Sequence, residues 1–252
     1  MRRFKLVIAY DGSAFMGFAK QGELNTIEGA LENALKRLNI QSPLTAAGRT
    51  DKGVHATRQV VAFNAPAFWS AQKLLAHLAP KLAPHIVCQS LEQVGLDFHP
   101  RFCAHKRRYR YILSQMPSPF LARYVAFHPH GTLESLQEAL NCFVGTHDFK
   151  YFCKTGSNPK HTRRTLYKAF CYPFYVGRLD CVVVVFEANG FLRAQVRLML
   201  GAALKCSLGH LSLEDLKAQL ALKKRTSTDL APSNGLYLSR VVYPQPLSKN
   251  GV

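Results

Sequence analysis

One carboxylate stands among cations in a short segment flanked by glycines. Residues 48–56 read Gly-Arg-Thr-Asp-Lys-Gly-Val-His-Ala, which places Asp51 two residues after Arg49 and one before Lys52. Neighbouring positive charge favours the ionised form of a carboxylate, and the flanking glycines allow a tight turn that another molecule can approach closely. Such a carboxylate is either a structural ion pair or a nucleophile. The spacing alone favours the structural interpretation, in which Asp51 pairs with Arg49 or Lys52.

A second candidate site is an alternation of basic and aromatic residues, Arg107-Arg108-Tyr109-Arg110-Tyr111-Ile112. On a β-strand, Tyr109 and Tyr111 would share one face while Arg108 and Arg110 share the other. This arrangement suits a nucleotide, because an aromatic ring stacks on a base and arginines bind phosphates. A half-buried strand with its tyrosines in the core and its arginines in solvent accounts for the pattern equally well.

The third candidate is the segment 190–201, which reads GFLRAQVRLMLG. A helix over residues 191–206 would place Arg193 and Arg197, four residues apart, on one face, opposite an apolar stripe. Gly201, one turn after Arg197, would let a neighbouring element approach closely. Taken by itself, an arginine on such a helix is expected to be solvated.

The charge of the chain indicates a polyanionic partner. Among 252 residues there are 33 Lys and Arg against 15 Asp and Glu, a net charge of +18, while the hydrophobic content of 48% is ordinary for a globular protein. Residues 101–168 carry 12 Lys and Arg against three acidic residues, which is half of the net charge. Such an excess costs self-repulsion, so nucleic acid is the expected partner. No long helix combines a basic face with an aromatic, leucine-rich one, which argues against a membrane surface.

The cysteines and histidines give no metal-site spacing. The seven cysteines include no C-x-x-C, and they are expected to be small buried residues in a reducing compartment. His128-Pro129-His130 has no third ligand nearby, so no metal is expected. The apolar run near the N-terminus is too short for a signal peptide, and residues 181–186 are too few to span a membrane. We therefore expect a cytoplasmic protein.

The hydrophobic periodicity predicts an α+β fold made of two related halves. Strands are expected at 4–10, 44–47, 59–63, 86–94, 107–113, 167–176, 179–188 and 236–243, and helices at 27–38, 71–78, 133–144, 191–206 and 213–222. Asn25 or Thr26 would cap the first helix, and with Asn25 as the cap Glu28 would complete a capping box. The predicted domains are 1–98, carrying the Asp51 loop, and 99–246, completing the cleft, followed by a tail at 247–252.

Residues 48–55 resemble the nucleophile motif of the tRNA pseudouridine synthase A family. Other blocks that resemble the family follow in order along residues 3–244: Tyr10-Asp11-Gly12-Ser13 with Phe15, Gly17 and Gln21; His99-x-Arg101-Phe102 with Arg108-Tyr109-x-Tyr111; Asp148-Phe149; Gly190-Phe191-Leu192 with Val196-Arg197 and Gly201; and Ala231-Pro232 with Gly235-Leu236-Tyr237-Leu238. Ordered blocks are far more specific than any single motif.

The chain departs from the family pattern at three places. Phe18-Ala19 stands where the family usually has Trp-Gln, and Ala194-Gln195 stands where His-Met is usual. The spacing at Leu82-Ala83-Pro84 also differs from the common Leu-Pro. These departures are expected to affect packing or RNA contacts, and therefore the range of substrates more than the chemistry.

The resemblance implies two α+β halves with a continuous mixed or antiparallel sheet flanked by helices. It implies that Asp51 is the nucleophile that converts uridine to pseudouridine, that Arg197 forms an ion pair with it, and that Tyr109 lies against the target base. Arg49 would help to extrude the nucleotide, since the reacting atoms are otherwise inside a stacked stem. No metal or organic cofactor is implied. The implied partners are the anticodon arm of tRNA, at nucleotides 38–40, and a second copy of the chain in a homodimer.

Two other functions compete with this one. The scaffold could belong to a non-catalytic RNA-binding or RNA-folding protein, but the presence of Asp51, Arg197 and Tyr109 together favours the enzyme. A metal-dependent nuclease would need clustered carboxylates, which the sequence lacks. Whether Asp51 attacks the ring or the sugar stays open.

Overall fold

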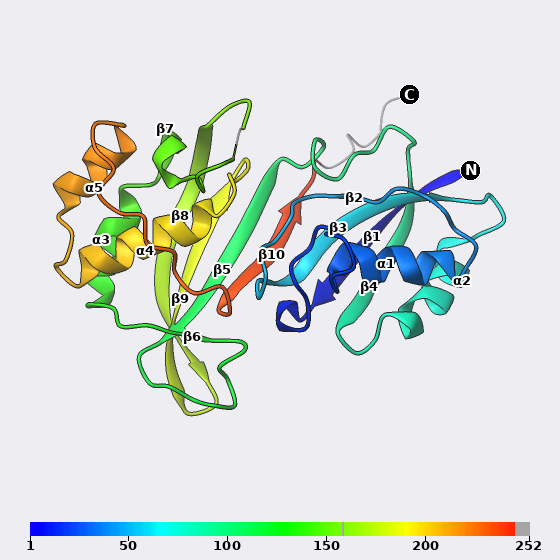
Figure 1. The fold of residues 1–252 in the computed structure, drawn as a ribbon, viewed down its shortest axis with the longest axis horizontal. Helices are drawn as coiled ribbons and strands as arrows, with labels where there is room; N and C mark the ends of the chain where they lie inside the picture. The colour runs from blue at the N-terminus through cyan, green and yellow to red at the C-terminus, as the bar shows by residue number, and fades with distance from the viewer. Residues whose placement is uncertain (158, 245–252) are drawn as a thin grey trace, which may run out of the picture.

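The computed structural model describes residues 1–157 and 159–244, and its centre is one mixed ten-stranded sheet (Figure 1). The strand order is β4-β1-β3-β10-β5-β9-β8-β7, with β2 paired to β3 and β6 paired to β5. The strands are β1 (Arg2–Tyr10), β2 (Thr45–Ala46), β3 (His55–Ala65), β4 (Ile86–Val94), β5 (Lys106–Ser114), β6 (Ala126–Phe127), β7 (Gly145–Asp148), β8 (Arg163–Val176), β9 (Leu179–Ala188) and β10 (Leu236–Val242).

Five α-helices and three short 3₁₀ turns complete the described chain. The helices are α1 (Ile27–Lys36), α2 (Ala71–Leu78), α3 (Leu133–Asn141), α4 (Gln195–Ser207) and α5 (Leu213–Leu220), and the 3₁₀ turns are η1 (Gly12–Ala14), η2 (Ala79–Lys81) and η3 (Lys150–Phe152). The predicted α+β class and most predicted elements are confirmed, and the bounds of α2, β4 and β9 agree with the expected ranges.

Local capping explains where most of the helices begin. Thr26, Ser70, Thr132 and Ser212 precede α1, α2, α3 and α5, and each side-chain oxygen accepts a backbone N–H of the first turn. In contrast, α4 follows Ala194, which has a φ of 59° and no side chain able to cap the helix. The start of α4 therefore has no side-chain cap at Ala194; the side chain of Gln195 instead accepts the N–H of Leu192.

The predicted capping box at Asn25 is wrong. Thr26, the other candidate, accepts the N–H of Gly29, and the Asn25 amide donates instead to the carbonyl of Ala14. The Glu28 carboxylate accepts the backbone N–H of Lys20 at 2.8 Å. The sequence prediction also missed β6 and β7, because strands of two and four residues are too short to show alternation.

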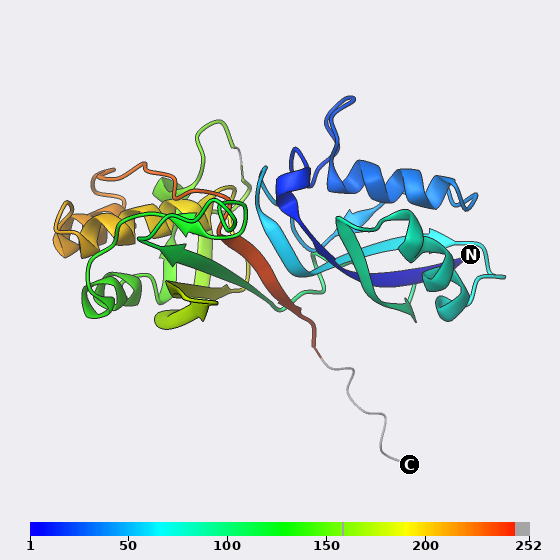
Figure 2. The ribbon, with the colours of Figure 1, turned by 90° about the horizontal axis from the view of Figure 1, so that it is seen from below.

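Two large hydrophobic cores lie along the sheet and the C-terminal strand joins them, while a smaller cluster forms around Val7, Ala47 and Val60. One core is formed by α1 and α2 against β1, β3 and β4, and the other by α3, α4 and α5 against β5, β8 and β9. Figure 2 shows α1 and α4 on the same side of the sheet. Burying a large apolar side chain in such a core stabilises the fold by about 1.5–3 kcal/mol. Tyr109 packs against both cores, at their junction.

Strand β10 lies between the two halves, parallel to β3 and antiparallel to β5. The sheet is therefore continuous across the junction, as expected. The domain boundary between residues 98 and 99 stays a prediction, and the tail at 247–252 lies outside the described residues. No helix in the described ranges is long and apolar enough to cross a membrane.

Candidate active site

The Asp51 carboxylate lies on the loop between β2 and β3, and its neighbours hold the loop in place. Buried Thr50 shares a hydrogen bond with the hydroxyl of Tyr10 at 2.8 Å, and its carbonyl accepts the N–H of Phe18 at 3.0 Å. The N–H of Val54 donates to the carbonyl of Asp51 at 3.1 Å and closes the turn. The Asp51 side chain is 37% exposed, so a substrate can reach it while its backbone stays fixed.

Glycines allow the first turn of the chain to approach this loop closely. A Cβ at Gly12 would lie 2.0 Å from the carbonyl oxygen of Val54, and one at Gly17 would lie 3.2 Å from that of Thr50. Gly17 and Gly53 also have φ values of +104° and +79°, which side-chain-bearing residues rarely adopt. Position 53 thus requires glycine because of its positive φ. Position 12 requires glycine because a side chain would collide with the backbone of Val54.

Arg197 of α4 reaches Asp51 from the other half of the chain. Its Nη1 lies 3.4 Å from Oδ2 of Asp51, and its Nε donates to the carbonyl of Ala231 at 2.8 Å. The N–H of Ala231 donates back to the carbonyl of Arg197 at 3.2 Å. A Cβ at Gly201 would lie 2.2 Å from the carbonyl oxygen of Asp229. The glycine therefore lets the segment 229–231 lie against α4 and orient the guanidinium.

The structural interpretation of Asp51 as a turn residue paired with its neighbours is wrong. Within residues 1–157 and 159–244, Asp51 forms its ion pair with Arg197 and with neither Arg49 nor Lys52, and both of those side chains are exposed. The structure does not bring Arg49 into contact with the carboxylate. The expectation that Arg193 and Arg197 share a helix face is also wrong, because α4 begins at Gln195 and exposed Arg193 precedes it.

Tyr109 lies on the same side of the sheet as Asp51, close to the glycine that opens the motif. A Cβ at Gly48 would lie 3.9 Å from its hydroxyl, and its ring meets that of Phe191 edge to face at 5.1 Å between centroids. Burial raises the pKa of Tyr109 to about 12, although the nearby Arg107 acts in the opposite direction. The hydroxyl is therefore protonated at neutral pH, and it can donate a hydrogen bond.

Tyr111 is a site residue that the sequence reasoning did not select. It is fully buried on the same face of β5 as Tyr109, and its hydroxyl has no hydrogen-bond partner among the described residues. Burial raises the pKa of this hydroxyl, and the positive charge of the neighbouring Arg197 lowers it in part. The alternation of Arg and Tyr along the strand was the available signal, but it could not distinguish Tyr111 from a core residue.

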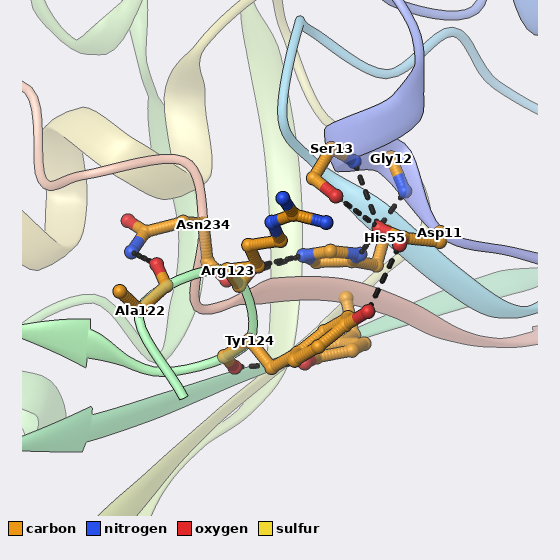
Figure 3. Close-up of polar contacts among 9 residues, drawn as sticks. Asp11, Gly12, Ser13, His55, Ala122, Arg123, Tyr124 and Asn234 are labelled. Carbon is orange, nitrogen blue, oxygen red and sulfur yellow. Dashed lines mark hydrogen bonds and ion pairs between the residues drawn. The ribbon is translucent and has the colours of Figure 1, made fainter. Parts of the chain in front are cut away.

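His55, the histidine of the motif, connects the start of β3 to two distant segments (Figure 3). It is 2% exposed, and its Nδ1 accepts the N–H of Gly12 at 3.0 Å. That contact assigns the proton to Nε2, which donates to the carbonyl of Arg123 at 2.8 Å. The ring also stacks on Tyr237 with 4.7 Å between centroids. The sequence reasoning gave His55 no role of its own, although its place in the motif pointed to it.

Side-chain hydrogen bonds hold residues 122–125, which precede β6, next to the turn that follows β1 (Figure 3). The hydroxyl of Tyr124 donates to Oδ2 of Asp11 at 3.0 Å, and the amide of Asn234 donates to the carbonyl of Val125 at 3.0 Å. Burial pushes the pKa of Asp11 upward, but hydrogen bonds from Ser13 and Tyr124 outweigh it and hold the pKa below its usual value. The ionised Asp11 therefore links residues 122–125 to the turn that supports the Asp51 loop.

Two of the departures from the family pattern are packing residues. Phe18 is 1% exposed in the first core, where its ring lies 6.4 Å from that of Tyr10. Gln195 is fully buried, and its Oε1 accepts the N–H of Leu192 at 2.8 Å. The glutamine thus provides a hydrogen-bond acceptor at the start of α4, where Ala194 offers none.

Taken together, the site holds one accessible carboxylate, one guanidinium and two protonated tyrosine hydroxyls. The described residues contain no group of three or more His, Cys, Asp or Glu arranged to hold a metal ion. An ionised carboxylate with a fixed cationic partner can act as a nucleophile toward an electrophilic carbon. The aromatic ring of Tyr109, next to the carboxylate loop, offers a surface for a planar base.

Comparison with known proteins identifies the family. The family model described as tRNA pseudouridine synthase matches residues 6–103 and 139–244. Curated relatives named tRNA pseudouridine synthase A include one from Helicobacter pylori, 46% identical over 244 residues, and one from Campylobacter jejuni, 42% identical over 245 residues. Each alignment covers 96% of this chain and the whole of the relative. The chain belongs to the tRNA pseudouridine synthase family.

Among solved structures, the likeness is weaker. The crystal structure of a Cbf5-Nop10-Gar1 complex aligns with 93% of this chain and 48% of that chain, at 11% identity and a TM-score of 0.37. A likeness at this level supports no further conclusion.

Proposed function

We propose that this protein isomerises uridine to pseudouridine in the anticodon arm of tRNA, at nucleotides 38–40, with Asp51 as the nucleophile. The observation that carries the proposal is the ion pair between Asp51 and Arg197, which come from opposite halves of a family member and meet beside Tyr109. The net charge of +18 supports an RNA substrate.

The reaction rearranges one nucleotide without any other reactant. Asp51 attacks the uridine and forms a transient bond to it, the bond between N1 and C1′ breaks, and the freed uracil turns so that C5 bonds to C1′. The bond to Asp51 then breaks, which regenerates the carboxylate. The hydrogen on C5 is then released as a proton, and N1 gains a proton, so the atoms balance. Arg197 pairs with the carboxylate and orients it, and the ring of Tyr109 lies against the base.

The target nucleotide must leave its stack before Asp51 can reach it, which costs a few kcal/mol. Exposed Arg49, two residues from the nucleophile, is proposed to assist this extrusion or to fill the vacated space. We further propose that the protein acts in the cytoplasm as a homodimer, in keeping with the family resemblance.

A tritium-release assay tests the proposal, because isomerisation must free the hydrogen at C5 of uridine. The wild-type protein should release tritium from tRNA labelled at that position. Asp51→Asn, which keeps the shape and removes the charge, should abolish release while tRNA binding remains. Asp180→Asn, at an exposed position of β9, is the matched control and should be fully active.

The same assay separates the enzyme from its alternative, a non-catalytic RNA-binding or RNA-folding protein. Tight tRNA binding without tritium release from any tRNA would support that alternative and end the enzyme proposal. Release by the Asp51→Asn variant at the wild-type rate would refute the assignment of the nucleophile.

A further inference from the structure

Register irregularities occur on three strands of the sheet, β4 at its edge and β3 and β10 further in. Where register shifts, Gln89 of β4 is left without a partner on β1, and Ser239 of β10 is left without one on β5. Between them, Thr57 and Arg58 of β3 together face a single residue of β1. Each of these is a β-bulge, which bends the strand and re-aims its side chains. Bulges are over-represented next to functional sites.

The residues at these bulges line a pocket of about 380 Å³. Strands β3 and β10 pair in parallel over only two residues, Tyr237 with His55 and Leu238 with Ala56. Beyond that point the pocket, here called the bulge pocket, is lined by four arginines and three polar side chains: Arg58, Arg108, Arg110 and Arg240, with Thr57, Gln89 and Ser239. All seven carry hydrogen-bond donors, and none of the seven is a carboxylate.

The bulge pocket lies on the opposite face of the sheet from Asp51. Side chains alternate between the two faces of a strand, and Arg108 and Arg110 flank Tyr109 on β5. Tyr109 and Tyr111 pack on the helix side, in the cores that α1 and α4 cover. Because the sheet separates the two sites, a nucleotide bound next to Asp51 cannot also occupy the bulge pocket.

The charge of the bulge pocket is only partly balanced. Buried Glu187 accepts a hydrogen bond from Nε of Arg108 at 2.8 Å and pairs with its Nη2 at 2.6 Å. Arg58, Arg110 and Arg240 are exposed, and none of them forms an ion pair within the described residues. Guanidinium groups that share one pocket repel one another unless an anion is bound. Their planar forks match the geometry of phosphate oxygens.

We propose that the bulge pocket binds backbone phosphates of tRNA at a segment outside the anticodon stem-loop. This inference rests on the proposed function for its substrate, and adds to it a second contact with the same class of molecule. None of the seven lining residues is aromatic, so a base has no ring on which to stack. The pocket would therefore bind the phosphate backbone of the RNA without distinguishing its base sequence. It would strengthen tRNA binding without taking part in the chemical step.

Binding of two RNAs to paired variants tests the inference. Arg58→Ala, Arg240→Ala and the double variant are compared with Arg178→Ala, an exposed arginine in the β8–β9 turn. Arg108 is left intact because its removal would leave the buried carboxylate of Glu187 without the arginine with which it pairs. Fluorescence anisotropy measures the affinity for full-length tRNA and for the isolated anticodon stem-loop, each at several salt concentrations.

The double variant should bind full-length tRNA roughly tenfold more weakly at physiological salt. The slope of log K against log salt should fall by about 1–2, since each phosphate contact contributes about 0.7–0.9. Affinity for the stem-loop, and tritium release at saturating tRNA, should stay as in the wild type and in Arg178→Ala.

Three results would overturn the inference. The first is an unchanged affinity of the double variant for tRNA. The second is an equal loss of affinity of the double variant for tRNA and for the stem-loop. The third is calorimetric binding of inorganic phosphate to the wild type that the double variant loses, without any change in tRNA affinity. The last would indicate a site for a small free anion. Failure of the proposed function is distinguishable, because it appears as absent tritium release by the wild type, whereas these measurements follow binding alone.

Discussion

Replacing Arg197 tests how the two halves of the chain cooperate at Asp51. Arg197→Met removes the charge but keeps a long side chain, and Arg197→Lys keeps the charge but loses the Nε that donates to Ala231. At 3.4 Å and an effective dielectric constant of about 20, the direct attraction between the two charges is about 5 kcal/mol. Asp51 is 37% exposed, however, so water screens much of this attraction, and exposed pairs contribute only about 0.2–1 kcal/mol.

We therefore expect a coupling free energy of about 1–2 kcal/mol between Asp51 and Arg197, above that of an exposed pair and well below the unscreened value. The hydrogen bond to Ala231 involves a charged donor and contributes a further ~1.5–3 kcal/mol to stability. That contribution is lost in Arg197→Met whether or not Asp51 is present, so it cancels in a double-mutant cycle. The cycle isolates the ion pair itself.

Urea unfolding of the wild type, Asp51→Asn, Arg197→Met and the double variant measures this coupling. In the tritium-release assay, a coupling of about 1–2 kcal/mol corresponds to turnover roughly 5- to 30-fold slower in Arg197→Met, with Arg197→Lys in between. Arg193→Met, at the exposed residue ahead of α4, should match the wild type in both assays. A coupling below about 0.3 kcal/mol, together with Arg197→Met turnover within twofold of wild type, would refute the reasoning.

Two further perturbations follow from the supports of the site. The pKa of Asp11 is held below its usual value, so its stabilisation is present above about pH 4 and is lost as the pH falls through the lower folded-state value. Tyr124→Phe should therefore cost about 0.5–1 kcal/mol at pH 7 in urea unfolding, and the cost should shrink as the pH is lowered below about 4; a cost that does not change with pH would contradict this. Gly201→Ala places a Cβ 2.2 Å from the carbonyl oxygen of Asp229 and should cost about 1–3 kcal/mol in thermal unfolding. It should also slow tritium release by displacing Ala231 and hence Arg197, and unchanged stability and turnover would argue against that route.

The predictable parts of the fold are those whose signal is local. The bounds of α2, β4 and β9 were predicted from the sequence. Helix α2 buries one face, at Leu74 and Leu78, whereas β9 is a largely apolar run that is buried at residues 181–188. The start of α4 escaped prediction because Ala194 gives no capping signal and has a φ of 59°, which an alanine rarely adopts. Short β6 and β7 escaped because their pairing partners, not their own residues, make them strands.

The residues of the candidate site were likewise predictable only in part. The motif around Asp51 and the ordered blocks of the family were sufficient to select Asp51, Tyr109 and Arg197 as residues of one site. The burial of Tyr111 beside Arg197 and the bridging position of His55 were not visible, because neither residue type indicates its own surroundings. The predicted role of Arg49 stays a prediction, since the structure leaves its side chain exposed and away from the carboxylate.

By itself, the amino-acid sequence determined the α+β elements, the strong positive charge and the glycine-flanked carboxylate, since all three depend on composition or short-range spacing. Residue spacing favoured pairing of Asp51 with Arg49 or Lys52 and the family resemblance implied Arg197; the folded chain forms the pair with Arg197, 146 positions away. Only the tertiary structure decided that arginines gather beside bulges of three strands on the face opposite Asp51. The physical reason is that strand order and register bring distant side chains together, and neither is set by the spacing of residues along the chain.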